Sequence, residues 1–172
     1  MMNKTELRSA TSAINKIIKL TPKARKDYAG CFYDKQGRQI IVANCIAIRL
    51  NEHLPVPEAK IPFSNVDNLF LPACENTKEL DLLSLEDLKD YIHSAKECKY
   101  RGHKSIVYDF GERLPMVNPE YMLLMYKVLG WQNLTAKVNE DKWETSPIYF
   151  CSDRGDGILM PIKKKECVKW TR

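Results

Sequence analysis

The order of hydrophobic periodicities along the chain constrains its fold more than any other feature. In the segment 5–20, apolar residues recur at the spacing of one helical face, at Leu7, Ala10, Ile14, Ile17 and Ile18. Strand-like runs follow from residue 28. The same order returns near the end, where the helix-like run PEYMLLMYKVLG precedes three strand-like runs. Two βαβββ-like halves around one core account for this repetition. The sequence therefore predicts an α+β fold with helices packed on antiparallel sheets.

Local signals place the ends of these elements. Asn3 with Glu6, and Ser84 with Asp87, have the spacing of capping boxes, and the run Asn-Pro-Glu at 118–120 opens a third helix. The turn DKQGR predicts a hairpin that is followed by another strand.

The middle of the chain follows neither half of this plan. Prolines at positions 55, 57, 62 and 72 break any helix, so residues 51–83 are expected to hold short extended pieces. A helix predicted to reach about residue 98 and the loop after it form an inserted helical element over 84–104.

Length and composition favour one domain over residues 1–172. With 44% hydrophobic residues the chain can fill one sizeable core. No apolar stretch approaches the roughly 20 residues that cross a bilayer, and the start lacks an apolar secretory run. We therefore expect a soluble cytoplasmic protein without a membrane partner.

The six cysteines contain no CxxC pair and are expected to be small buried hydrophobes. His93, Cys98 and His103 match no standard zinc spacing, so no metal or cofactor is predicted.

Positive charge is concentrated at the two ends of the sequence. The net charge is +5: residues 1–27 carry +5, residues 163–172 carry +4, and the stretch between them carries −4. This pattern suits a polyanionic partner, but basic ends, such as a basic tail over 163–172, also serve as plain solubilising segments. The polar face of the first helix and the turn after it supply the candidate cations Arg8, Lys16, Lys19, Lys23, Arg25 and Lys26.

The segment 117–164 resembles the closing segment of bacterial DNA sliding clamps, the DNA polymerase III beta subunit family. The matching pieces are Asn118, Tyr121, Pro147 and the run Ile-Leu-Met-Pro-Ile at 158–162. Near the start, Arg8 and the run GCFYDKQGRQIIVAN are similar to a clamp helix and its hairpin. The two stretches cover a little over half of the chain.

The resemblance implies a clamp-like fold that binds and does not catalyse. It implies that duplex DNA phosphates contact Arg8, Lys16 and Lys19, with the following turn extending the patch; a solvated helix face is the alternative. It also implies that replication or repair proteins contact Ile158, Met160 and Pro161, for which ordinary core packing is the alternative.

The sequence departs from the clamp pattern in its size. A clamp chain holds three such domains and two chains close a ring, whereas 172 residues supply one domain. No strand precedes the first helix, and the middle third is unmatched. We therefore expect a diverged relative, from a phage or other mobile element, that forms a homo-oligomer if clamp-like edges are kept.

Catalytic motifs are missing from the sequence. It contains no phosphate-binding glycine loop, no GxSxG and no HExxH. Asp153 and Asp156 in DRGDG are typical of a turn between two strands. The first hypothesis is a non-enzymatic clamp-like accessory domain that binds DNA. The alternative is a protein interaction module without DNA binding, and an enzyme that uses Asp153 or Asp156 is a third.

Overall fold

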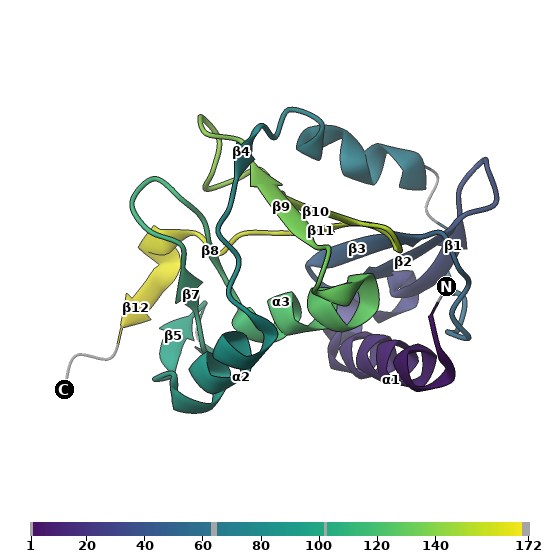
Figure 1. The fold of residues 1–172 in the computed structure, drawn as a ribbon, viewed down its shortest axis with the longest axis horizontal. Coiled ribbons are helices and arrows are strands. Elements are labelled where there is room, and N and C mark those ends of the chain that lie inside the picture. The colour runs from purple at the N-terminus through teal and green to yellow at the C-terminus, as the bar shows by residue number, and fades with distance from the viewer. Residues whose placement is uncertain (1, 63–64, 102, 170–172) are drawn as a thin grey trace.

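The computed structural model describes residues 2–62, 65–101 and 103–169. Its largest element is a seven-stranded sheet with the order β1-β2-β3-β11-β10-β9-β4, in which neighbouring strands run antiparallel. Helices cover both faces of this sheet (Figure 1). The predicted α+β fold, with helices packed on an antiparallel sheet, is confirmed.

Two helix-plus-strand units build most of the sheet. The first comprises α1 (Lys4–Leu20), the 3₁₀ helix η1 (Lys23–Tyr28), β1 (Gly30–Tyr33), β2 (Gln39–Ala43) and β3 (Ile46–Leu50). The second comprises α3 (Pro119–Met125), the π-helical turn η3 (Tyr126–Gly130), β9 (Thr135–Val138), β10 (Ile148–Ser152) and β11 (Gly155–Leu159). The last strands of both units, β3 and β11, pair at the centre, with Ile48 opposite Gly157. The predicted repetition of a helix followed by strands is confirmed, but among the described residues no strand precedes α1, so the first unit lacks the leading strand of a βαβββ half, and the strand directly before α3, Met116–Val117, lies outside this sheet.

Short turns fix the register of the first unit. Gln39 lies opposite Tyr33 across the predicted DKQGR hairpin, where Gly37 has a φ of 77°. The next turn leaves two residues, Asn44 and Cys45, between β2 and β3, and Asn44 takes a φ of 53°. Asn is among the few residues that adopt this left-handed conformation readily. The predicted hairpin and the strand after it are confirmed.

The main core lies between the sheet and helices α1, α2 and α3, which share one face (Figure 1). Its fully buried members include Ala10, Ile14 and Ile17 from α1, Ile41 and Ile48 from the sheet, and Met122 from α3. Fully burying one of these Ile or Met side chains contributes about 1.5–3 kcal/mol. The spacing of these α1 residues fixes which side of the helix faces outward.

A second core cluster lies on the opposite face of the sheet, under the 3₁₀ helix η2 (Val66–Ala73). Val66, Phe70 and Ala73 are buried there against sheet residues that include Ile40 and Ile158. The prediction of extended pieces from the prolines was wrong for this segment. Pro72 lies in the last turn of this short helix, where its missing N–H removes one hydrogen bond, and burial of three apolar side chains outweighs that cost.

The rest of the segment between the two units adds the edge strand β4 to the main sheet and forms smaller elements beside it. In chain order, its elements are β4 (Lys78–Glu79), α2 (Leu85–Ser94), β5 (Cys98–Tyr100), β6 (His103–Ser105), β7 (Tyr108–Asp109) and β8 (Met116–Val117). The predicted insertion over 84–104 thus holds a helix and a hairpin. Among the described residues, no helix is long and apolar enough to cross a membrane.

The predicted basic tail is folded as far as the structure describes it. It forms the 3₁₀ turn η4 (Lys164–Glu166) and β12 (Cys167–Lys169), which pairs with β5. Lys164 contacts Asp109 at 2.7 Å. Residues 170–172 of the tail lie outside the described residues.

The expectation that the cysteines are buried was right for Cys31 and Cys98, and wrong for Cys74 and Cys151, which are exposed.

Candidate nucleic-acid and partner interfaces

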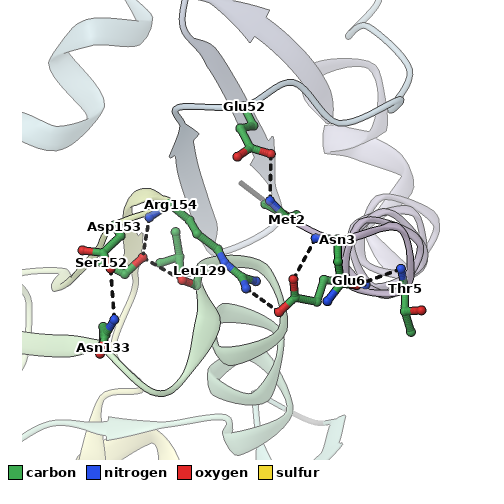
Figure 2. A network of polar contacts seen from close by, with 10 residues as sticks. All are labelled: Met2, Asn3, Thr5, Glu6, Glu52, Leu129, Asn133, Ser152, Asp153 and Arg154. Carbon is green, nitrogen blue, oxygen red and sulfur yellow. Dashed lines mark hydrogen bonds and ion pairs between the residues drawn. The ribbon is translucent and has the colours of Figure 1, made fainter.

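A capping box fixes the start of α1. The Asn3 side chain accepts hydrogen bonds from the backbone N–H groups of Thr5 and Glu6, each at 3.0 Å, and the Glu6 carboxylate accepts from the Asn3 N–H at 2.9 Å. Figure 2 shows this arrangement beside the contact between Glu6 and Arg154, which comes from the turn between β10 and β11. The predicted cap is confirmed, and the second unit holds the first helix at its N-terminal end.

Glu6 is the acidic residue of α1, and its carboxylate is already engaged. The hydrogen bond from the Asn3 N–H, and next the one from Arg154, hold the pKa of Glu6 below its ordinary value of 4.5. The ionised Glu6 carboxylate forms its ion pair with Arg154, at 2.5 Å, and not with the cations further along the helix. The rest of the outward face of α1 is therefore left positive.

All six predicted DNA-binding cations are exposed. Arg8, Lys16 and Lys19 lie on α1, opposite or beside its buried stripe, and the other three lie on η1: Lys23, Arg25 and Lys26. Within the part of the chain that the structure describes, none of the six forms an ion pair. Other surface lysines do have carboxylate partners: Lys60 pairs at 3.3 Å with Asp27, the acidic residue of η1.

We call these six residues the basic surface. Arg8 and Lys19 are eleven residues apart in sequence. Because a helix rises about 1.5 Å per residue, their positions lie about 16 Å apart along the α1 axis. Unpaired cations keep their full charge available to an external anion. The surface therefore combines positive charge with a length of several phosphate spacings.

The predicted partner-binding residues do not share one environment. Ile158 is 6% exposed and packs in the second core cluster. Met160 is 43% exposed and forms the edge of an apolar groove of about 410 Å³. Tyr28, Val42 and Leu69 line the same groove, and Ile158 contributes to its floor. Core packing thus accounts for most of the Ile158 surface, while Met160 is available to a partner.

Pro161 lies in a second, larger pocket next to this groove. This pocket has a volume of about 800 Å³, and Arg25, Cys45 and Met160 line both cavities. Burial raises the pKa of the Cys45 thiol to about 12, so this thiol stays neutral between the two cavities. Arg101, which the sequence reasoning did not select, also lines the larger pocket.

Both acids of DRGDG are paired with side chains of other segments of the chain. Asp156 is buried and receives two hydrogen bonds from the Arg49 guanidinium, at 2.8 and 2.6 Å. The Arg49 guanidinium lies 4.6 Å from the centre of the Phe70 ring, and its pKa is raised, first by the hydrogen bond to Asp156. Asp153 accepts from the Asn133 amide at 3.0 Å. Over the described residues, no group of three His, Cys, Asp or Glu side chains is arranged to hold a metal ion.

Two features of the molecular surface thus suit a macromolecular ligand. The first is the basic surface on α1 and η1, and the second is the apolar groove bordered by Met160. Comparisons of the chain with models of known families, with curated proteins and with solved structures find no match.

Proposed function

We propose that the protein is a non-enzymatic, sliding-clamp-like accessory domain that binds duplex DNA through the phosphates. The observation that carries the proposal is the basic surface, whose six exposed cations have no ion-pair partner in the described chain. Lysine and arginine side chains that are free of carboxylates neutralise phosphates and release counterions, which gives affinity without base reading.

The arrangement of the helices supports the clamp-like part of the proposal. α1 and α3 pack on the same face of one antiparallel sheet (Figure 1), and each is followed by three strands of that sheet. This order agrees with the sequence resemblance, which implies that a clamp presents basic helices to the duplex. In this chain α1 carries most of the charge, since the exposed charged residues of α3 and η3 are one acid, Glu120, and one base, Lys127. The duplex is therefore proposed to follow α1.

The edges of the sheet bear on how the domain could assemble. The outer edge of β1 is covered: the Cys31 N–H donates to the Pro57 carbonyl at 2.9 Å, and the Cys31 carbonyl accepts from the Ala59 N–H at 3.2 Å. The opposite edge strand, β4, has two residues. A ring closed through β1 would first have to displace residues 57–59, so the proposal is for a domain that acts without strand-to-strand assembly at β1.

A second candidate function is a protein interaction module. The observation in its favour is the apolar groove of about 410 Å³, where Tyr28 and Met160 are each 43% exposed. Replication or repair proteins, or a second copy of the chain, are the partners that the sequence resemblance suggests. In this function Met160, with Pro161 behind it, binds the partner, and the basic surface only keeps the protein soluble.

Binding to a labelled DNA duplex across a salt series tests the first proposal. Contact through phosphates must weaken steeply as salt rises, because counterions released into a more concentrated salt solution gain less entropy. Binding that falls steeply from 50 to 200 mM salt supports the DNA-binding function. Absence of binding at 50 mM salt contradicts it, and a stable complex with a protein would then favour the interaction module.

A further inference from the structure

The pocket of about 800 Å³ beside Pro161 carries a chemistry that neither candidate function uses. It lies where η1, the β2–β3 turn, the β5–β6 turn and the chain after β11 meet. Its basic lining residues come from three of these segments: Arg25, Arg101, Lys104 and Lys163. Glu144 is the one acidic side chain among the described residues that line it, and Lys104 also pairs with Glu97, at 3.0 Å, outside the lining. An excess of donors with positive charge favours an anionic ligand.

Aromatic and amide groups complete the walls of this pocket. Tyr100 and Tyr121 line it, and the Arg101 guanidinium lies over the Tyr100 ring, 5.3 Å from its centre. The Tyr121 hydroxyl accepts a hydrogen bond from the Asn44 side-chain amide, which holds this ring in place. Phenol rings and guanidinium planes are the surfaces on which unpaired bases stack. A bare phosphate ion would fill a small part of the space, whereas a whole nucleotide suits it.

The pocket is also continuous with the basic surface. Arg25 lies on η1 between Lys23 and Lys26, and it lines the pocket as well. Positive charge therefore runs from α1 through η1 to the pocket. We propose that this pocket binds an unpaired nucleotide, with its phosphate among Arg25, Arg101 and Lys104 and its base against the tyrosine rings.

The proposal does not rest on duplex binding by α1. Arg101 lies in the turn between β5 and β6 and Lys104 lies in β6, in the inserted segment, and neither belongs to the six residues of the basic surface. Their loss can therefore be measured separately from loss of the α1 cations. An acidic peptide is negatively charged, like a nucleotide chain, but it has no base to stack. It is therefore the appropriate competitor.

The test measures fluorescence anisotropy of a labelled, 5′-phosphorylated ten-nucleotide oligothymidine with the full chain at 50 mM salt. The test variant is Arg101→Asn/Lys104→Gln. Asn suits position 101, where φ is 47°, because it tolerates the left-handed conformation. The control is Lys78→Gln/Lys142→Gln, which removes the same charge from two lysines that, like Lys104, pair with glutamates. Thermal melts of both variants show that each is folded.

We expect the test variant to bind the oligonucleotide about tenfold more weakly, because it loses one to two charge-assisted contacts. Its affinity for duplex DNA should equal that of the control. Displacement of the oligonucleotide by ADP would show that the pocket takes a single nucleotide. Displacement by unlabelled oligonucleotide alone would show that it takes a strand. Equal affinity of the two variants, or equal displacement by an oligoglutamate peptide, would overturn the proposal. Loss of duplex binding in Arg8→Ala/Lys16→Ala/Lys19→Ala, with the oligonucleotide still bound, would separate this site from the basic surface.

Discussion

Replacing Arg8, Lys16 and Lys19 by alanine should weaken duplex binding and make it less sensitive to salt. All three side chains are exposed, lie on α1 and have no ion-pair partner among the described residues. Their removal leaves the buried stripe of the helix and its capping box intact. Since alanine is the best helix former, α1 should persist and the fold should be retained.

The size of this effect follows from the number of phosphates contacted. If each of the six cations of the basic surface neutralises one phosphate, the slope of log K against log salt is roughly −5.4, and the triple variant brings it to roughly −2.7. Between 50 and 200 mM salt, the wild-type affinity should fall roughly 2,000-fold and that of the variant about 40-fold. Fluorescence anisotropy titrations of one labelled duplex at four salt concentrations give both slopes.

A matched control separates local contact from overall charge. Lys35→Ala/Lys78→Ala/Lys142→Ala removes the same net charge from the β1–β2 turn, β4 and the loop after β9. We expect this variant to keep a slope close to that of the wild type. A triple α1 variant whose slope and affinity match those of the control would refute the reasoning, because the charge would then act without any phosphate contact at α1.

Three further predictions concern the fold and the groove. Gly155→Ala should prevent stable folding in thermal melts, because Gly155 has a φ of 144° and a Cβ there would lie 2.1 Å from a carbonyl oxygen of β3. In the control Gly37→Ala no heavy atom lies within 4 Å of the new Cβ, so this change should lower the free energy of unfolding by only about 1 kcal/mol. Burial raises the pKa of Asp34, but hydrogen bonds from the following turn outweigh it and leave the pKa below 3.8. Its stabilising effect is therefore complete above pH 3.8 and is lost as the pH falls through the lower folded value, so urea denaturation should show less acid destabilisation in Asp34→Asn than in the wild type. Ile158→Ala should lower the free energy of unfolding by about 2–5 kcal/mol and Met160→Ala by well under 1 kcal/mol, and similar losses for both would contradict the assignment of Met160 to the surface.

Signals carried by neighbouring residues predicted most of the fold. The Asn3–Glu6 pair and the run at 118–120 placed two helix starts, because a cap depends on side chains within three residues of the helix. The DKQGR turn placed the first hairpin for the same reason. The 3₁₀ helix η2 was missed, since its stability comes from contacts of Phe70 with distant strands and not from its own sequence.

The candidate surfaces were predictable to different degrees. Helical periodicity alone puts Arg8 and Lys19 opposite the buried stripe, so their exposure followed from the sequence. The pocket that contains Arg101 has walls from segments as far apart as residues 22 and 163. No local pattern brings those segments together. Its one sequence signal was the cluster of basic and aromatic residues in the loop KYRGHK.

The pairing of β3 with β11 has a consequence for synthesis of the protein. This ladder joins residues 107 positions apart, as in the contact between Arg49 and Asp156. During translation, the apolar residues of β3 therefore emerge long before the strand that covers their edge. Long-range pairing of this kind slows folding and leaves an unpaired strand open to other nascent chains. The first unit should accordingly depend on chaperones until β11 has left the ribosome.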